Sequence, residues 1–216
     1  MKHCEAQYTE SCRRILDALL GERPHFHGWE SEPGSRNYSL SGDVLKWMAA
    51  HIPPGGAGLE TGCGYSTLVF AAMCATHTVV SLFSHEHQLI REWGSRHALD
   101  MHNVTWIAGL SQEHLPGLRS DHSLDMVLID GDHAFPAPFM DWYWSADRLK
   151  VGGIMIVDDI QLATGRILKE FLEMERERWQ PMDVIDKTAI FKRISSNPVA
   201  RGALWTKQPW VGEPPG

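Results

Sequence analysis

The segment spanning residues 58–67 constrains the fold of this chain more than any other. It reads G-L-E-T-G-C-G-Y-S-T, so a short apolar run leads to the acid Glu60 and then to a turn at Gly62 and Gly64. A helical pattern begins at Ser66. Glycines let a backbone turn sharply and approach a ligand closely, and the free N–H groups of a new helix favour a carboxylate or phosphate. The segment therefore predicts a strand, a glycine turn and a helix that together bind an adenosine-bearing ligand.

Strand-like and helix-like stretches alternate from this segment onward. Apolar runs predict strands at residues 59–61, 78–82, 104–108, 126–129 and 153–157. Helical patterns follow at residues 66–75, 86–99, about 136–149 and about 163–179. This alternation predicts a parallel sheet covered on both faces, and the close runs at 182–186 and 189–193 predict a terminal antiparallel pair. We expect an α/β protein with a doubly wound, Rossmann-like sheet of seven strands, mostly parallel.

The rest of the chain suggests three parts. Two amphipathic stretches, residues 9–20 and 41–51, predict helices before the sheet, with Ser41 as the N-cap of the second. We therefore expect residues 1–57 to be a helical extension that covers the substrate side. Residues 58–194 would be the ligand-binding core, and residues 195–216 a Pro/Gly-rich tail or lid.

Composition and charge exclude several classes of protein. The 216 residues suffice for one sizeable core, and a net charge of −7 without a basic block argues against a nucleic-acid partner. No apolar run approaches the roughly 20 residues that span a bilayer, and the polar N-terminus lacks the apolar core of a secretion signal. The four cysteines show no C-x-x-C spacing. We expect a cytoplasmic protein that binds no membrane; the nine tryptophans are compatible with a homodimer.

Two acidic motifs follow later strands. The fourth strand ends in D-G-D-H, which runs from Asp130 to His133, and the fifth ends in Asp158 and Asp159. Ligands of doubly wound sheets bind outside the carboxyl ends of the strands, where the strand order reverses. In the common order 3-2-1-4-5, these residues and Glu60 are expected to line one mouth.

The glycine turn departs from the dinucleotide fingerprint. Thr67 stands where the third glycine of G-x-G-x-x-G belongs, and the acid expected about 20 residues further on falls near Phe83. The nearest acid is Glu86. These departures disfavour NAD, although an NAD(P)-linked oxidoreductase stays as an alternative. A P-loop is excluded, because no Gly-Lys-Ser/Thr follows.

Three motifs together resemble those of class I S-adenosylmethionine-dependent methyltransferases. The turn E-T-G-C-G-Y-S resembles their first motif, and V-L-I-D-G-D-H and G-G-I-M-I-V-D-D resemble the fourth- and fifth-strand motifs of the small O-methyltransferases. That group includes the catechol, caffeoyl-coenzyme A and bacterial natural-product enzymes. The resemblance covers about residues 40–193. It implies S-adenosylmethionine as cofactor, a small-molecule acceptor methylated on oxygen, and assistance by Mg²⁺ or Ca²⁺.

The resemblance also implies roles for individual residues. Asp130 and His133 would be catalytic, with His133 as general base. Phe83 occupies the place of the usual ribose-binding acid, and Glu86 is the candidate substitute. The cofactor site would comprise Glu60, Thr61, Gly62, Gly64, Tyr65, Ser66, Phe83, Ser111 and Asp130. The metal ligands would be Asp130, Asp158 and Asp159.

The chemistry of these residue types supports that reading, and each has a simpler alternative. Carboxylates gathered at one mouth repel one another unless a cation lies among them, and hard oxygen ligands suit Mg²⁺ or Ca²⁺. Yet Asp158 and Asp159 could instead cap the following helix, Asp132 could be a turn residue, and His133 could only begin a helix. Trp29 could pack in the core or form an aromatic wall over a substrate. Because Phe83 replaces an acid, a methyltransferase-like binding module without catalysis is a further alternative.

Overall fold

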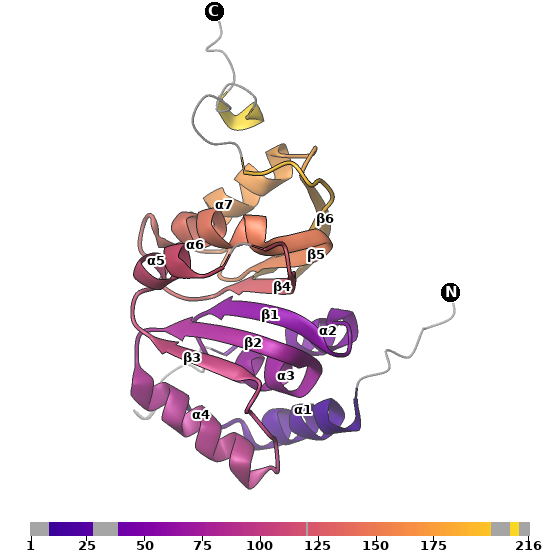
Figure 1. Cartoon of the computed structure of the whole chain (residues 1–216), viewed down its shortest axis with the longest axis vertical. Coiled ribbons are helices and arrows are strands. Elements are labelled where there is room, and N and C mark those ends of the chain that lie inside the picture. The colour runs from indigo at the N-terminus through magenta and orange to yellow at the C-terminus, as the bar shows by residue number, and fades with distance from the viewer. Residues whose placement is uncertain (1–8, 28–38, 120, 200–207, 212–216) are drawn as a thin grey trace, which may run out of the picture. The chain divides into compact units, whose positions relative to one another are not determined.

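The computed structural model describes residues 9–27, 39–119, 121–199 and 208–211 (Figure 1). The chain divides into two compact units, residues 1–110 and 111–216, and each is described by itself. Trp29 and most of the C-terminal tail lie outside the described residues.

The first unit contains three parallel strands in the order β3-β2-β1: β1 (Gly56–Thr61), β2 (Cys74–Ser81) and β3 (Val104–Ala108). The central strand is β2, in which Val79 pairs with Glu60 on one side and with Trp106 on the other. Val79 and Val80 are fully buried, as expected of a strand with neighbours on both sides and helices over it.

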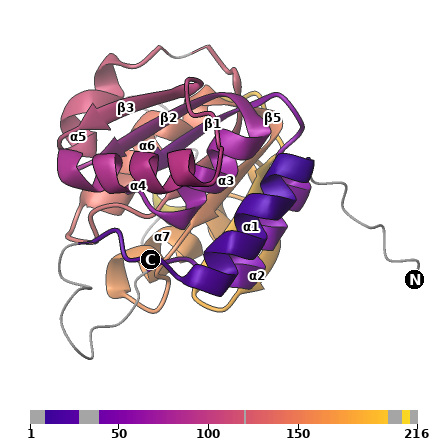
Figure 2. The same ribbon diagram turned by 90° about the horizontal axis from the view of Figure 1, so that it is seen from below.

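The helices of this unit are α1 (Glu10–Glu22), α2 (Gly42–His51), α3 (Tyr65–Met73) and α4 (Ser84–Arg96). The first two begin at residues whose side chains cap the helix. Thr9 Oγ1 accepts a hydrogen bond from the Cys12 N–H at 3.1 Å, and Ser41 Oγ accepts one from the Val44 N–H at 3.4 Å, which confirms Ser41 as an N-cap. The apolar helix α3 packs against α1, α2 and α4 (Figure 2), so the unit is built around the helix that follows the glycine turn.

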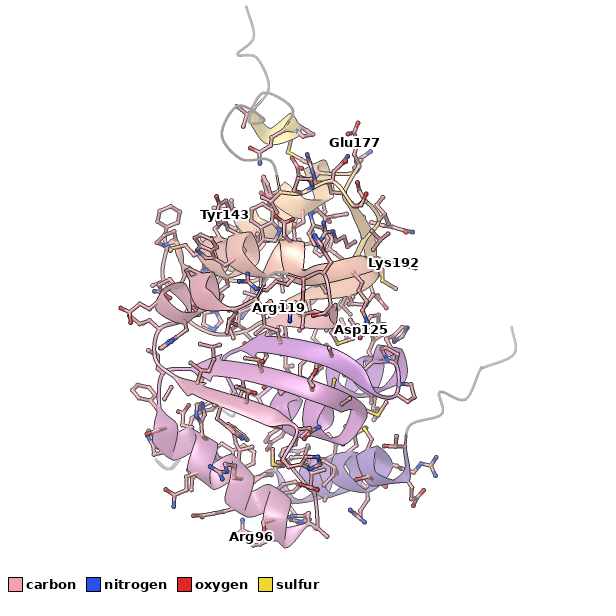
Figure 3. The ribbon with its side chains drawn as sticks, in the orientation of Figure 1. Arg96, Arg119, Asp125, Tyr143, Glu177 and Lys192 are labelled. Carbon is pink, nitrogen blue, oxygen red and sulfur yellow. The ribbon has the colours of Figure 1, made fainter. Side chains whose placement is uncertain are left out.

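The second unit contains four strands in the order β4-β5-β7-β6: β4 (Leu124–Ile129), β5 (Leu149–Val157), β6 (Trp179–Ile185) and β7 (Thr188–Arg193). The pair β4 and β5 is parallel, whereas β7 runs antiparallel to β5 and to β6. At the beginning of β5, Lys150 pairs with Asp125 of β4, with Nζ 2.9 Å from Oδ1 (Figure 3 labels Asp125). At the other end of β5, Val157 pairs with Ala189.

The helices of the second unit are α5 (Ser111–His114), α6 (Ala137–Ser145) and α7 (Ala163–Met174), with short 3₁₀ turns at Leu115–Gly117, Ala146–Arg148 and Pro209–Val211. The rings of Trp142 on α6 and Phe171 on α7 meet edge to face at 4.8 Å. The beginning of the C-terminal tail is attached to this unit, because the Val199 N–H donates to Asp147 Oδ1 at 2.9 Å.

The predicted fold class is confirmed: the described residues form a doubly wound, mostly parallel α/β arrangement of seven strands with a terminal antiparallel pair. Several predicted boundaries were wrong. The helix expected up to residue 149 ends at Ser145, and the one expected up to residue 179 ends at Met174. The strand expected from residue 78 begins at Cys74, because Asn103 Nδ2 donates to the carbonyls of Ala71 and Cys74 and closes α3 early. None of the helices among the described residues is long and apolar enough to cross a membrane.

Candidate active site

The glycine turn opens toward the first turn of α3. Gly62 has φ +85°, a conformation that glycine adopts without strain, and its N–H donates to the Val80 carbonyl at 2.9 Å. The Gly64 N–H donates to Thr67 Oγ1 at 3.0 Å, so the residue that replaces the third dinucleotide glycine caps α3. Among the described residues, a Cβ built on Gly64 would meet only His27 Nε2, at 4.0 Å. The turn therefore keeps free space beside the helix N-terminus.

Glu60 lies beneath this turn and is completely buried. Its Oε2 accepts a hydrogen bond from Ser66 Oγ at 2.6 Å, and its Oε1 lies 3.0 Å from His77 Nε2. His77, which sequence reasoning missed, stacks on Phe70 with ring centroids 4.4 Å apart. Gly58 was the available signal, since a Cβ there would lie 2.6 Å from Phe70. Glu60 thus holds Ser66 and the first turn of α3 in place.

Thr61 and Tyr65 border the turn in different ways. The hydroxyl of Thr61 is buried and has no hydrogen-bond partner among the described residues. The Tyr65 hydroxyl donates to the Pro24 carbonyl at 2.9 Å, and its ring meets Phe26 edge to face at 5.8 Å. The segment after α1 therefore covers the glycine turn, whereas Thr61 is left with an unsatisfied polar atom of the kind that native proteins rarely bury.

The predicted ribose position is occupied by an exposed phenylalanine, and an acid lies nearby. Phe83 precedes α4 and is 42% exposed. Glu86, in the first turn of α4, is buried, with Oε1 3.0 Å from His27 Nδ1 and Oε2 accepting from the Cys63 thiol at 3.5 Å. Because Cys63 belongs to the glycine turn, the Glu86 carboxylate lies at the turn itself.

Ser81, His87 and Cys63 form a second set of polar contacts beside the turn, and none of them is charged. Ser81 Oγ lies 2.6 Å from His87 Nε2 and donates to Cys63 Sγ at 3.2 Å. Burial lowers the pKa of His87 and raises that of the Cys63 thiol, so both groups are uncharged at neutral pH. This arrangement is suited to packing, since a protonated thiol is a poor nucleophile.

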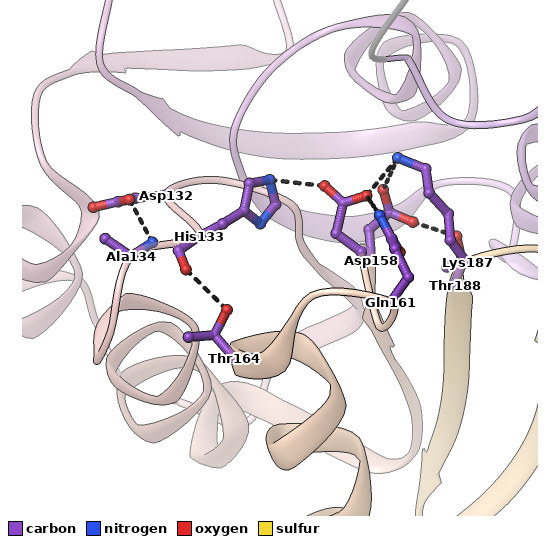
Figure 4. Close-up of polar contacts among 9 residues, drawn as sticks. Asp132, His133, Ala134, Asp158, Gln161, Thr164, Lys187 and Thr188 are labelled. Carbon is purple, nitrogen blue, oxygen red and sulfur yellow. Dashed lines mark hydrogen bonds and ion pairs between the residues drawn. The ribbon is translucent and has the colours of Figure 1, made fainter.

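Three residues of the acidic motifs in the second unit form one compact cluster, and Figure 4 shows the polar contacts around His133. Asp130 follows β4, His133 lies three residues later, and Asp159 follows β5. Each offers one ligand atom, and these three atoms lie within 4.8 Å of one another, which makes this the one group of potential metal ligands among the described residues. His133 Nε2 lies 2.9 Å from Asp159 Oδ2. Two carboxylates and one imidazole thus surround one point.

Asp159 is the most strongly held member of the cluster. Its Oδ1 accepts hydrogen bonds from Lys187 Nζ at 2.6 Å and from Gln161 Nε2 at 2.7 Å. Burial alone raises the pKa of Asp159, but the hydrogen bonds from His133, Lys187 and Gln161 outweigh it and hold this pKa well below its usual range. Asp159 is therefore ionised, and its backbone has φ +53°, an uncommon value for a residue other than glycine.

Asp158 is not brought into the cluster. It is buried, accepts a hydrogen bond from the Thr188 hydroxyl, and forms an ion pair with Lys187 Nζ at 3.2 Å. The antiparallel register explains this contact. Val157 pairs with Ala189, so Asp158, which follows Val157, lies opposite Thr188, which precedes Ala189. Burial alone lowers the pKa of Lys187, but its contact with Asp159 and the surrounding carboxylates raise it. Lys187, which sequence reasoning missed, is thus a cation between two aspartates.

The sequence also allowed purely structural roles for four residues of the acidic motifs. Neither Asp158 nor Asp159 caps α7, which follows Leu162 without a side-chain cap. Asp132 is a turn residue, since its Oδ1 accepts from the Ala134 N–H at 2.8 Å. His133 does not begin α6 directly; its carbonyl instead accepts from the Thr164 hydroxyl at 2.8 Å.

Ser111, predicted to lie on the adenine side of the cofactor, begins the short helix α5. It is buried, and its hydroxyl donates to Asp141 Oδ1 at 2.5 Å. The side chain therefore joins α5 to α6, and a cofactor contact there would involve the backbone.

Part of this chain is similar to a known protein family. Residues 59–160 match the family model described as a methyltransferase domain. The matched segment is slightly less than half of the 216-residue chain. It contains the glycine turn and all three cluster residues, and it confirms the resemblance to class I S-adenosylmethionine-dependent methyltransferases over the NAD(P) alternative. The comparison with curated proteins gives no match.

Solved structures of methyltransferases share the fold. The O-methyltransferase TomG from Streptomyces achromogenes, involved in tomaymycin synthesis and bound to SAM, has a TM-score of 0.60 at 15% identity, covering 89% of this chain and 93% of TomG. Cofactor-bound Rv0187 from MTB has a TM-score of 0.60 at 18% identity, with coverage of 83% and 89%. A putative caffeoyl-CoA O-methyltransferase from Staphylococcus aureus has a TM-score of 0.57 at 15% identity, with coverage of 84% and 98%. The chain thus has the fold of these enzymes.

Proposed function

We propose that this protein transfers a methyl group from S-adenosylmethionine to an oxygen atom of a small molecule, assisted by a divalent cation. The observation that carries the proposal is the position of Asp130, His133 and Asp159, which cluster directly after β4 and β5 inside the methyltransferase domain. Methyl transfer to oxygen needs a deprotonated hydroxyl held in line with the methyl group, and a cluster of this composition can supply both conditions. Two structural neighbours that are described as O-methyltransferases, one of them as putative, support the choice of oxygen.

The glycine turn supplies the features that a methyl donor requires. The N–H groups at the beginning of α3 favour the carboxylate of its methionine part, and the space beside Gly64 admits it. For the ribose hydroxyls we propose Glu86 in place of Phe83, because its carboxylate lies at the turn and an ionised carboxylate accepts two hydrogen bonds. The unpartnered hydroxyl of Thr61 is a further group that a bound ligand would satisfy.

The cluster fits a divalent cation by its donor set. The carboxylates of Asp130 and Asp159 are hard oxygen ligands that suit Mg²⁺ or Ca²⁺, and a nearby imidazole extends the range toward Mn²⁺. When bound, such a cation lowers the pKa of an acceptor hydroxyl and fixes its position. Asp158, the third predicted ligand, would act on the site indirectly, through its contacts with Thr188 and Lys187.

We assign the proton transfer to His133. Asp159 contacts His133 Nε2 at 2.9 Å, and this contact orients the ring for a role as general base. One nitrogen cannot ligate a cation and accept a proton at the same time. We therefore propose that Asp130 and Asp159 bind the cation and that His133 accepts the proton of the acceptor hydroxyl.

Calorimetry with S-adenosylhomocysteine tests the cofactor, and a panel of hydroxylated acceptors followed by mass spectrometry tests the reaction. We expect binding, a mass gain of one methyl group, and loss of turnover in EDTA that Mg²⁺ or Mn²⁺ restores. Absence of binding at millimolar ligand would refute the proposal, and turnover that survives EDTA would remove the cation from it.

A second candidate is a methyltransferase-like binding module without catalysis. The exposed Phe83 at the predicted ribose position favours it. Such a module would bind S-adenosylhomocysteine in the calorimeter yet methylate nothing in the panel, including in the presence of Mn²⁺.

A further inference from the structure

Lys187 is carried to the acidic cluster by a tight hairpin. The strands β6 and β7 are joined by the two residues Asp186 and Lys187, and Ile185 pairs with Thr188 across the turn. The Lys187 carbonyl accepts a hydrogen bond from the Ile160 N–H at 2.9 Å. The hairpin is thus attached through its backbone to the segment that follows Asp159, independently of the lysine side chain.

The ammonium of Lys187 contacts the two aspartates that follow β5. Its Nζ lies 2.6 Å from Asp159 Oδ1 and 3.2 Å from Asp158 Oδ2 (Figure 4). With His133 on Asp159 Oδ2, both oxygens of Asp159 have donors. A divalent cation that binds Asp159 must therefore displace a donor or share the carboxylate with a positive charge close by.

We propose that the Lys187 ammonium is a built-in counter-ion that competes with the divalent cation for Asp159, so that cation binding requires its release. This inference rests on the cation-assisted part of the proposed function. The ammonium lies on a side chain that is 32% exposed, which leaves water available to receive it when it is displaced. The competition makes the cation-free protein stable and its cation affinity modest.

The test measures Mn²⁺ affinity by calorimetry with the full chain. Lys187→Met removes the ammonium and keeps the backbone hydrogen bond to Ile160. We expect this variant to bind Mn²⁺ at least about tenfold more tightly than the wild type, because a unit charge this close opposes a divalent cation even in water. Without metal, its thermal midpoint should be lower than that of the wild type, and Mn²⁺ should raise it by more.

Two variants serve as controls. Lys187→Arg keeps the charge and should bind Mn²⁺ like the wild type. Lys150→Met removes a lysine from another aspartate pair, at the opposite end of β5, and should also leave the affinity unchanged.

The proposal is overturned if Lys187→Met binds Mn²⁺ no more tightly than the wild type, including the case in which neither binds it. A variant that only loses thermal stability would show that Lys187 is structural. Mn²⁺ binding by the wild type separates the two failures. If the wild type binds Mn²⁺ and Lys187→Met binds it no more tightly, only the role of Lys187 is overturned. A wild type that binds no Mn²⁺ also removes the cation from the proposed function.

Discussion

Glu60 and His77 form a completely buried carboxylate–imidazole contact, with Oε1 3.0 Å from Nε2 and neither side chain exposed. The other oxygen of Glu60 accepts the hydroxyl of Ser66, so one acid joins β1, β2 and α3. Because both polar groups lie beneath the glycine turn, their pairing governs the stability of the turn that the cofactor is proposed to contact.

Glu60→Ala should therefore destabilise the fold strongly. It leaves the His77 ring and the Ser66 hydroxyl buried without their acceptor, which costs about 3 kcal/mol of unfolding free energy. Urea denaturation followed by tryptophan fluorescence measures the loss. Asp125→Ala is the matched control, since its pair with Lys150 is at the surface and contributes less than about 1 kcal/mol. Equal losses for the two variants would contradict the structural role of Glu60.

Glu86→Gln should weaken cofactor binding. If its carboxylate holds the ribose hydroxyls, its charge loss raises the Kd for S-adenosylhomocysteine by about tenfold or more. Glu92→Gln changes a surface residue of the same helix, which accepts from Gln88 at 2.8 Å, and should leave the Kd unchanged. A larger effect from Phe83→Ala than from Glu86→Gln would assign the ribose contact to Phe83.

The two proposed roles at the cluster predict different losses. His133→Asn should lower kcat by about 10²- to 10⁴-fold, as expected on removal of a general base, while Mn²⁺ affinity changes little. Asp130→Asn should instead weaken Mn²⁺ binding. Calorimetry and steady-state kinetics on both variants separate the roles, and loss of Mn²⁺ binding in His133→Asn would make the imidazole a ligand.

Asp159 should make stability depend on acid pH. Its pKa is lowered in the folded chain from the ordinary value of 3.8, so the unfolded chain takes up a proton that the folded chain does not. Its contribution is present above this value and is lost as the pH falls toward the lower folded pKa. Urea unfolding between about pH 5 and about pH 2 should show this decline. The decline should be shallower in Asp159→Asn; an unchanged slope would show that other groups cause it.

Arg193 should be essential to the second unit. Its buried guanidinium donates to the carbonyls of Ala146 and Leu149 at 2.8 Å each, and also to that of Ser195 at 2.9 Å. Arg193→Ala leaves these carbonyls without a donor and should cost about 3 kcal/mol of unfolding free energy. Lys192→Ala, one residue earlier on β7 (labelled in Figure 3), should cost less than about 1 kcal/mol. Comparable losses in the two urea curves would refute the role of Arg193.

Much of the fold could be predicted because it depends on local patterns. Apolar runs and the glycine turn place β1, α3 and the strands before Asp130 and Asp158, since side-chain periodicity and turn chemistry act over a few residues. Helix ends were less predictable. α6 was expected to continue to residue 149, but Leu149 begins β5.

The side-chain contacts at the site could not be predicted from the sequence, because they join residues that are far apart in the chain. Lys187 lies 28 positions from Asp159, and Glu86 lies 59 positions from His27. Neither pair follows from a motif; the first depends on the antiparallel register at the end of β5 and the second on the path of the chain after α1. The sequence identified the acids, and the tertiary structure determined which of them face one another.

The position of Lys187 late in the chain has a consequence during synthesis. Asp130 and Asp159 precede Lys187 in the chain, so translation produces the acids before their ammonium partner. A nascent or truncated chain that stops at residue 186 has the same aspartates without that lysine. In such a chain these carboxylates lack the ammonium, whereas the finished protein supplies that charge itself.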